Sequence, residues 1–305
     1  PCELIDDNGA ELKRVLTGLA ESRGMGADFI EWLTKANRFV GTLVDRIVPG
    51  YPRGEIAEIQ AETGYEDRNV VEGEIFHLWV LESDDRAQSR FPADKCGLNV
   101  LFVKDIKPYK ERKVKILNGA HTALVPVAYL AGFDTVREAI EDPKIGGFVK
   151  KLIFEEISPT IDLPEEQKKA FAESVIERFL NPFIRHELMS IALNSTAKFR
   201  TRLLPSLTDY VRLYKKLPVN LCCAFAAFIL FHRGKRGNGE AIALNDEPQY
   251  LARWKRAWDN FTDCESLARE VCGWKDIWGM DLAEIHADFT DAVAADLKKL
   301  MGAEA

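Results

Sequence analysis

The stretch Lys113-Val114-Lys115-Ile116-Leu117-Asn118-Gly119-Ala120-His121 begins the helical half of the chain and holds its clearest chemical pattern. A lysine, an asparagine and a histidine stand at positions i, i+5 and i+8. At about 3.6 residues per turn, i+5 lies roughly 140° and i+8 roughly 80° from i around an α-helix axis. A helix over this stretch therefore places Lys113, Asn118 and His121 on one broad side. The apolar residues between them suit the buried side.

These three residue types fit proton transfer at a carbinol oxygen. A free lysine has a pKa near 10.4, so it needs burial or a nearby cation to act as a base near pH 7. The cationic neighbours of Lys113 in the sequence are Lys110, Arg112 and Lys115. We predict Lys113 as the general acid/base, Asn118 as a donor to the developing oxyanion and His121 as a contact to a neighbouring hydroxyl. The alternative is a solvated, basic helix start in which Asn118 and His121 only pack.

Composition narrows the class of protein. The 305 residues are 47% hydrophobic, which suffices for a substantial core, and the formal charge of −7 argues against a nucleic-acid partner. The longest apolar run, residues 218–231, is roughly 14 residues, short of the roughly 20 that span a bilayer, so we expect no membrane partner. The six cysteines form no C-x-x-C pair, which favours neither a zinc site nor a disulfide framework and fits the reducing cytoplasm.

Metal and serine chemistry are not expected. The five histidines are widely scattered and no H-E-x-x-H motif occurs, so we predict no metal site. A lysine base also removes the need for a metal to acidify the alcohol. No G-x-S-x-G motif is present to start a serine triad.

The patterning divides the chain into an α/β part and a helical part. Residues 1–105 combine helical periods over 10–21 and 28–33 with strand-like runs over 75–81 and 100–103. After Pro108 the pattern is helical, with segments predicted over 122–130, 149–157, 164–179, 218–232, 251–261 and 282–301. Asp134 is a plausible N-cap for the residues that follow it. We therefore predict a domain over 1–105 and a helical substrate and catalytic domain over 106–305.

A dinucleotide-binding domain should begin with a strand and a G-x-G-x-x-G turn. No complete fingerprint is present: Gly24-Met25-Gly26 lacks the third glycine, and Gly146-Gly147 and Gly237-Asn238-Gly239 do not follow strands. We therefore expect the α/β part to be an incomplete Rossmann-like domain whose N-terminal portion the chain lacks. The residues that bind the cofactor are unknown on this basis.

Three blocks carry a family resemblance. They are Leu43-Val44-Asp45-Arg46-Ile47 followed by Pro49, the string from Lys107-Pro108-Tyr109 to His121, and Arg178-Phe179-Leu180-Asn181-Pro182. Together they resemble the mannitol dehydrogenase family, the polyol-specific long-chain dehydrogenases. Within it, Pro1-Cys2-Glu3-Leu4-Ile5, the Asp45–Pro52 block and Ser190-Ile191-Ala192-Leu193-Asn194 are most similar to the hexuronate branch.

The resemblance implies an α/β Rossmann-like part followed by a mostly α-helical domain, with NAD as cofactor and Lys113 as the general acid/base. The implied activity is the interconversion of tagaturonate and altronate in hexuronate catabolism. Asp45 is expected to contact a substrate hydroxyl or Lys113, the alternative being a turn stabiliser with Arg46. Arg178 matches the substrate-contacting arginine of the family, and a structural ion pair is its alternative.

A hexuronate carries a carboxylate that a hexitol lacks, and arginine is its natural bidentate partner. The segment Lys198-Phe199-Arg200-Thr201-Arg202 offers two arginines. We predict that Arg200 or Arg202 reads the carboxylate, and only one of them, because i and i+2 do not share a helix face. The alternative is that both arginines are solvated at the surface. Arg185 and His186 are weaker candidates for the contact to the carboxylate.

Two further functions stay open. One is a different member of the same class, a fructuronate reductase or a mannitol-type polyol dehydrogenase. The other is an inactive helical fragment that binds a substrate or partner without turnover, which the missing glycine-rich turn favours for this polypeptide alone.

Overall fold

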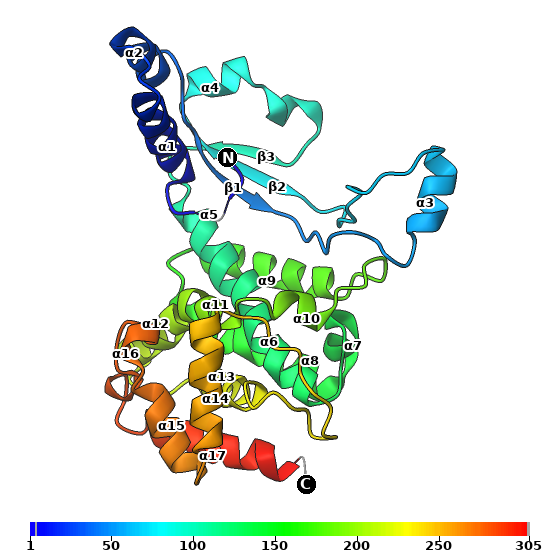
Figure 1. The fold of residues 1–305 in the computed structure, drawn as a ribbon, viewed down its shortest axis with the longest axis vertical. Helices are drawn as coiled ribbons and strands as arrows, with labels where there is room; N and C mark the ends of the chain where they lie inside the picture. The colour runs from blue at the N-terminus through cyan, green and yellow to red at the C-terminus, as the bar shows by residue number, and fades with distance from the viewer. Residues whose placement is uncertain (4, 304–305) are drawn as a thin grey trace. The chain divides into compact units, whose positions relative to one another are not determined.

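The computed structural model describes residues 1–3 and 5–303, which form two compact units, Pro1–Glu111 and Arg112–Ala305 (Figure 1). The division falls within α5 (Lys107–Arg112), a few residues after the boundary proposed from the sequence. Residue 4, part of one motif quoted above, lies outside the described residues.

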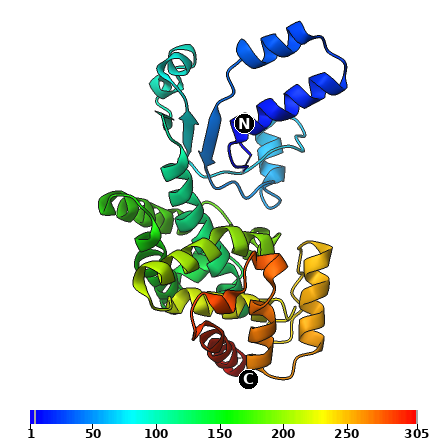
Figure 2. The ribbon, with the colours of Figure 1, turned by 90° about the vertical axis from the view of Figure 1, so that its left-hand side faces the viewer.

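The first unit contains a three-stranded mixed sheet (Figures 1 and 2). Its elements before α5 are α1 (Asn8–Ser22), α2 (Ala27–Lys35), β1 (Gly41–Asp45), α3 (Ile56–Thr63), β2 (Leu78–Glu82), α4 (Asp85–Arg90), the 3₁₀-helix η1 (Ala93–Cys96) and β3 (Val100–Val103). β2 is central: it pairs antiparallel with β1 and parallel with β3, and Val80 lies opposite both Leu43 and Leu101.

Strand alternation gives the sheet two apolar faces. Leu43, Leu78 and Val80 form the buried cluster on one face, against which Ile106 and Tyr109 pack. The next residues along β2 point the other way, because successive strand side chains alternate. On that second face Leu81, Ala93 and Val100 form a cluster with Val40, Trp79 and Phe102. The sheet is therefore covered on both sides, as in an α/β domain.

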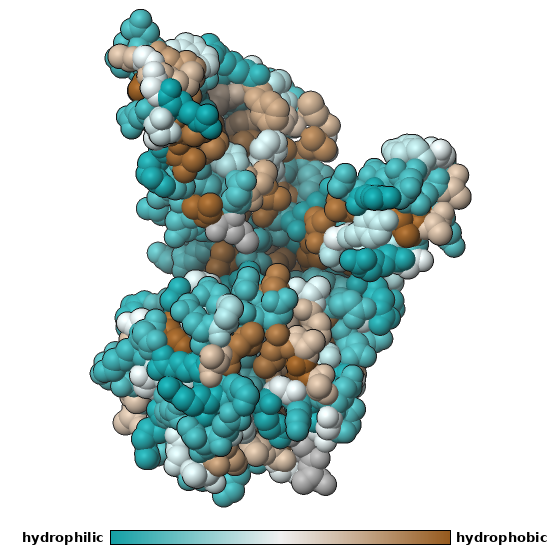
Figure 3. All heavy atoms as spheres, viewed as in Figure 1, coloured by the Kyte–Doolittle hydropathy of each residue, from teal (hydrophilic) through white to brown (hydrophobic). Residues whose placement is uncertain are grey.

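Asn8 and Gly9 fasten α1 to β1. The Asn8 side chain donates from Nδ2 to the Thr42 carbonyl and accepts at Oδ1 from the Thr42 backbone N–H, both at 2.9 Å. A Cβ at Gly9 would lie 2.5 Å from the Val40 carbonyl carbon, so only glycine fits this approach. The outer sides of α1 and α2 remain apolar in part: Val15, Leu19 and Trp32 are exposed, and Figure 3 shows hydrophobic surface in this region.

The second unit is helical throughout. After α5 come the π-helix η2 (Lys113–Asn118), α6 (Gly119–Leu130), α7 (Val136–Glu141), α8 (Pro143–Lys151), the π-helix η3 (Leu152–Ile157), the 3₁₀-helix η4 (Ser158–Thr160), α9 (Glu165–Phe179), α10 (Leu188–Ile191), α11 (Ser195–Arg202), α12 (Leu204–Tyr214), α13 (Val219–Phe231), α14 (Pro248–Asp259), α15 (Cys264–Cys272), α16 (Lys275–Trp278), the 3₁₀-helix η5 (Leu282–Glu284) and α17 (Phe289–Ala303).

The apolar helix α13 is the centre of this unit. Its residues 224–231 are all buried, and α6 and α17 pack against it. The N-cap residue of α13, Pro218, makes no side-chain hydrogen bond to the first turn. The Glu156 carboxylate caps the helix instead, because it accepts hydrogen bonds from the Asn220 and Leu221 backbone N–H groups, each at 2.8 Å. In the described part of the chain, no helix combines the length and apolar character needed to cross a membrane.

The predicted architecture, an α/β part followed by a helical part, is confirmed, although several elements differ. β1 and α3 were not predicted, and the strand predicted from Ile75 begins only at Leu78, because Ile75 is 90% exposed. The cap of α7 is Thr135 and not Asp134, since the Thr135 hydroxyl forms a capping box with Glu138. The helix predicted over 282–301 is divided between η5 and α17.

Candidate active site

The stretch from Lys113 to Asn118 is a π-helix, which corrects the α-helical geometry assumed from the sequence. In a π-helix the backbone N–H bonds the carbonyl five residues earlier, so Asn118 stands about one turn above Lys113. The wider turn brings these two residues closer to one side than an α-helix would. Lys113 is 9% exposed, Asn118 8% and His121 5%, which does not fit a solvated helix start. Short π segments are frequent at functional sites.

Aromatic contacts hold the His121 ring. It stacks on Phe179, the last residue of α9, with ring centroids 4.1 Å apart and planes at 24°. The His186 ring meets it edge-on at 5.0 Å. Among the described residues, no group hydrogen-bonds the buried Nε2 of His121. A fixed imidazole with an available buried nitrogen is suited to bind a polar group of a ligand.

His186 is placed by backbone pairing. Its carbonyl accepts from the Val136 N–H at 2.9 Å, and the Leu188 N–H donates to the Asp134 carbonyl at 2.9 Å. The segment after α9 is thereby tied to the start of α7, and His186 is held against His121. Burial lowers the pKa of His186 to about 4, so its imidazole is neutral at pH 7.

Several cationic groups converge on His121. Burial is the main cause that lowers the pKa of His121 well below its usual range, followed by His186, Arg202, Arg178 and Lys113. His121 is therefore neutral at pH 7, and one ring nitrogen carries hydrogen while the other accepts. The structure thus brings Lys113, His121, Arg178 and Arg202 together in the second unit. Such a concentration of positive charge favours an anionic ligand.

The two candidate arginines of α11 have different environments. Arg202, the last residue of the helix, is half-buried, and burial lowers its pKa. Its backbone lies close to α6: a Cβ at Gly119 would be 3.4 Å from the Arg202 carbonyl oxygen. Arg200 is exposed and donates from Nη1 to the Ile277 carbonyl at 3.2 Å. Of the two, Arg202 is therefore the arginine whose charge acts on His121.

Lys198, whose charge Arg202 affects, was not singled out by the sequence reasoning. Burial, followed by the charge of Arg202, lowers its pKa to about 8, whereas Asp246 raises it. Its ammonium donates to the Ile191 carbonyl at 2.8 Å. Its spacing from Arg202 could have indicated this residue, because Lys198 and Arg202 are four residues apart and so share one face of α11.

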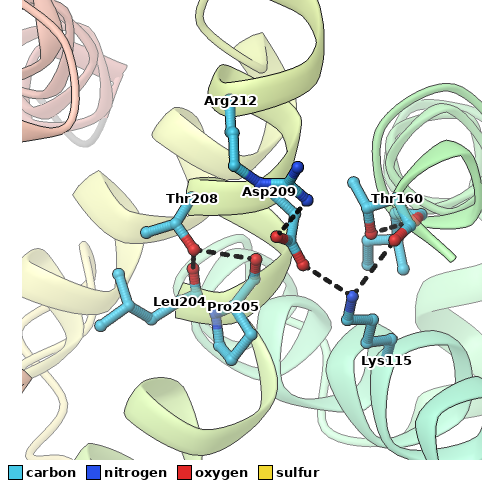
Figure 4. A network of polar contacts seen from close by, with 8 residues as sticks. Lys115, Thr160, Leu204, Pro205, Thr208, Asp209 and Arg212 are labelled. Atoms are coloured by element: carbon cyan, nitrogen blue, oxygen red, sulfur yellow. Dashed lines mark hydrogen bonds and ion pairs between the residues drawn. The ribbon is translucent and has the colours of Figure 1, made fainter.

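Two cationic neighbours of Lys113 in the sequence, Lys115 and Lys110, have partners elsewhere, and Figure 4 shows those of Lys115. The Lys115 ammonium lies 2.9 Å from the Asp209 carboxylate and donates to the Thr160 carbonyl at 3.3 Å. The Lys115–Asp209 pair joins η2 to α12, and Asp209 also pairs with Arg212 of the same helix at 3.0 Å. Lys110 pairs with Asp6 in the first unit. The cations that act on the candidate site are therefore the arginines of α9 and α11.

Asp45 belongs to the first unit. It is the last residue of β1, opposite Leu78 in the register, and is 1% exposed. The chain after it is fixed by Glu74: the Arg46 Nε donates to the Glu74 carbonyl at 2.7 Å, and the Ile47 N–H donates to its carboxylate at 2.6 Å. Arg178, in the second unit, is 8% exposed near the C-terminus of α9.

The strand-to-helix connections of the first unit are where a cradle for NAD would be expected. None of the strand-to-helix connections over 46–55, 83–84 and 104–106 contains G-x-G-x-x-G, so they do not fit the usual pyrophosphate cradle of NAD. In the described part of the chain, no three His, Cys, Asp or Glu side chains cluster closely enough to hold a metal ion.

Comparison with known proteins gives matches along the whole chain. The family model "Mannitol dehydrogenase Rossmann domain" matches residues 1–95, and "Mannitol dehydrogenase C-terminal domain" matches residues 105–301. Altronate oxidoreductases of Escherichia coli O6:K15:H31 (strain 536 / UPEC) and Escherichia coli O9:H4 (strain HS) are each 46% identical over 305 residues. These matches cover 99% of this chain and 63% of each relative, so the chain spans less than two thirds of their length.

Solved structures share the fold. A D-sorbitol dehydrogenase in substrate-free form superposes with a TM-score of 0.80 at 26% identity, covering 99% of this chain and 61% of that protein. The Pseudomonas fluorescens mannitol 2-dehydrogenase, in ternary complex with NAD and D-mannitol, gives a TM-score of 0.73 at 22% identity. That match covers 97% of this chain and 57% of the other. The predicted Rossmann-like part followed by a helical domain is thereby confirmed.

Proposed function

Since this chain belongs to the mannitol dehydrogenase family, as its motifs predicted, we propose that it works in an NAD-dependent, metal-independent oxidoreductase that interconverts tagaturonate and altronate. The altronate oxidoreductases that are 46% identical to it support this substrate pair. The observation that carries the proposal is that the charges of the buried Lys113 and Arg178 and of the half-buried Arg202 all act on the buried His121. These residues combine a proton donor, a neutral imidazole and two cations for an anionic sugar.

Lys113 is the proposed general acid/base. In the reductive direction the hydride to the carbonyl carbon would come from bound NADH. The Lys113 Nζ gives a proton to the carbonyl oxygen, which becomes the hydroxyl of altronate; oxidation reverses these transfers. The side-chain amide of Asn118 donates to the oxygen while charge develops on it, a contribution of a few kcal/mol. The π-helical turn supports this pairing, because both residues project from consecutive turns of η2.

His121 is proposed to bind a neighbouring hydroxyl through its buried Nε2. A neutral imidazole can donate or accept at this atom, and a sugar hydroxyl can do the same, so the contact needs no charge. The nearby cations favour the neutral imidazole, because they disfavour a protonated His121. Arg178 is proposed to contact a further substrate hydroxyl.

Arg202 is the proposed reader of the substrate carboxylate. A guanidinium matches a carboxylate with two parallel hydrogen bonds, and partial burial strengthens them. Lys198, on the same face of α11, adds a second positive charge. A hexitol offers no charge for these groups, which favours a uronate over mannitol. Arg200 is not proposed for this role, because its guanidinium is exposed and bonds the Ile277 carbonyl.

The proposal includes a cytoplasmic location, which the free, buried thiols of Cys222 and Cys272 fit. The expected partner is a small sugar acid. Neither a nucleic acid nor a membrane is proposed as a partner, since the net charge is −7.

The test is an NADH absorbance assay with tagaturonate, fructuronate and fructose, run on the protein purified from its source. An intact mass from the same sample records its length, since the curated relatives are longer than this chain. We expect the highest kcat/KM with tagaturonate. Faster turnover of fructuronate or fructose would assign the alternative substrates, and turnover of none of the three would overturn the proposal in favour of a binding fragment.

A further inference from the structure

A groove of about 440 Å³, here called the α12 groove, lies along one face of α12 in the second unit. Thr208, Val211, Arg212 and Lys215 form its first wall. Their spacing of i, i+3, i+4 and i+7 places them on a single stripe of the helix. The volume is within the range of about 300–1,000 Å³ that is typical of small-ligand sites. The lining residues differ from those of the candidate active site, so the groove is a separate feature.

The second wall of the α12 groove is a turn with its own hydrogen bonds. Met280, Ile285 and His286 form this wall, after the short helices α16 and η5. The Asp281 carboxylate caps η5 by accepting from the Ala283 backbone N–H at 3.1 Å. These elements hold the wall in shape, so a ligand need not order it, which lowers the cost of binding.

The middle of the α12 groove is apolar. Val211 is 8% exposed, and Met280 and Ile285 are half-buried on the opposite wall. An apolar lining with a small number of polar groups is the usual composition of a site for a small organic molecule. The groove therefore matches a ligand with a compact apolar body.

The polar groups of the α12 groove are two cations and an imidazole. Arg212 and Lys215 are exposed at the end of α12. The His286 Nδ1 accepts from the Asp288 backbone N–H at 3.2 Å, so in the neutral ring Nε2 carries the hydrogen. The Asp288 carboxylate lies 3.8 Å from the same Nδ1. The first wall thus offers charge for an anion, and the second adds a neutral donor.

The charges favour a ligand with one negative charge. The Arg212 guanidinium lies 3.0 Å from the Asp209 carboxylate, which also lies 2.9 Å from the Lys115 ammonium of η2 (Figure 4). Lys215 has no ion pair with any of the described residues. It stands at the C-cap of α12 with a φ of 54°, where glycine is usual. A bound carboxylate therefore gains one unpaired cation and meets Asp209 as a competitor for the other.

We propose that the α12 groove binds a small carboxylate with an apolar body, and that this carboxylate competes with Asp209 for Arg212. Because Asp209 also pairs with Lys115, occupancy of the groove is linked to η2. The proposal does not rest on the proposed function, since neither NADH nor a sugar acid takes part in the binding.

Methionine methyl NMR tests the binding directly. The chain has four methionines, of which Met280 lines the groove and Met189 lies in α10, three residues after His186. The ligand tested is 3-phenylpropionate, added to protein labelled with [¹³C-methyl]methionine, and Met280→Leu assigns the signal. We expect the phenyl ring to shift the Met280 signal saturably, whereas the uncharged 3-phenylpropanamide should bind more weakly. A shift of the Met189 signal alone, no shift, or equal affinities for acid and amide would overturn the proposal.

Four variants separate charge from packing. Lys215→Gly removes one charge at a backbone position that suits glycine, and Arg212→Met removes the other. Each should weaken binding of 3-phenylpropionate about 2- to 5-fold, as for an exposed ion pair, whereas Arg256→Met, at an exposed arginine of α14, should not. Asp209→Asn removes the competing charge, so binding should become tighter. Unchanged or weaker binding in Asp209→Asn, or wild-type binding in both Lys215→Gly and Arg212→Met, would contradict the proposal.

Discussion

The imidazole of His121 lies flat on the ring of Phe179, with centroids 4.1 Å apart and an angle of 24° between the planes. This pair joins α6 to the end of α9, the helix that also carries Arg178. The stack fixes the imidazole in a site where its Nε2 is buried and has no hydrogen-bond partner among the described residues. The aromatic contact therefore prepares a polar atom for a ligand.

Replacing Phe179 by leucine should weaken substrate binding. The aliphatic side chain keeps most of the apolar volume but loses the aromatic contact, which contributes about 0.5–1.5 kcal/mol. We expect the KM for tagaturonate to rise roughly 2- to 13-fold with a smaller change in kcat. The matched control is Phe183→Leu, because Phe183 is 81% exposed. Equal KM values in the two variants would remove the role given to the stack.

Arg202 and Arg200 form a second matched pair. In Arg202→Met the substrate carboxylate loses a charge-assisted partner, which contributes about 1.5–3 kcal/mol. The KM for tagaturonate should therefore rise roughly 13- to 160-fold. Arg200→Met should change it little, because that guanidinium is exposed and bonds the Ile277 carbonyl. Steady-state kinetics at saturating NADH measures the KM of both variants. An unaltered KM in Arg202→Met would contradict the role of Arg202 as the carboxylate contact.

His232 makes stability depend on pH. Burial lowers its pKa to about 4 in the folded protein, against about 6.5 in an unfolded chain. Between these values the unfolded state binds a proton that the folded state does not. The free energy of unfolding should therefore be fully retained above pH 6.5 and fall as the pH decreases towards 4, by up to about 3 kcal/mol from this residue.

Urea unfolding followed by tryptophan fluorescence at several pH values measures this effect, since Trp254 stacks on His232. His232→Gln should flatten the slope of stability between pH 6.5 and 4, even if the variant is less stable overall. A slope equal to that of the wild type would mean that His232 does not titrate in this way. His121 and His186, whose pKa values are also lowered by burial, should contribute to the remaining slope.

Lys115 should matter for stability and not for chemistry. Its ammonium pairs with Asp209 at 2.9 Å and is 8% exposed, so Lys115→Met leaves a carboxylate without this partner. We expect the free energy of unfolding to fall by about 1–3 kcal/mol, with kcat and KM nearly unchanged. Lys144→Met, at an exposed lysine, is the control. In Lys115→Met/Asp209→Asn the loss should be smaller than the sum of the two single losses.

The fold could be predicted where patterns are local. The apolar run that forms α13 and the periodicity of α1 needed no tertiary information. β1 was not predicted, because residues 41–45 become a strand only by pairing with β2. The strand predicted from Ile75 has the right residue types, but pairing begins at Leu78. Tertiary pairing, and not propensity, decides such boundaries.

The site was predictable in its residue types but not in its geometry. The spacing of Lys113, Asn118 and His121 was read on an α-helix, and nothing local signals that this segment is a π-helix. The cations next to Lys113 in sequence pair elsewhere, as Lys115 does with Asp209. The two arginines that act on His121 come from α9 and α11, which only the packing of the helices brings together. Lys198 was missed because its burial depends on the same packing.

The turnover of Lys113→Ala with tagaturonate and NADH, with and without methylamine, tests the central claim most directly. We predict that the variant folds, as judged by circular dichroism, and loses at least about 100-fold in kcat, because its proton donor is absent. Added methylamine should restore part of the rate, and Lys144→Ala should behave as the wild type. A Lys113→Ala variant that reduces tagaturonate at a near-normal rate would contradict the account.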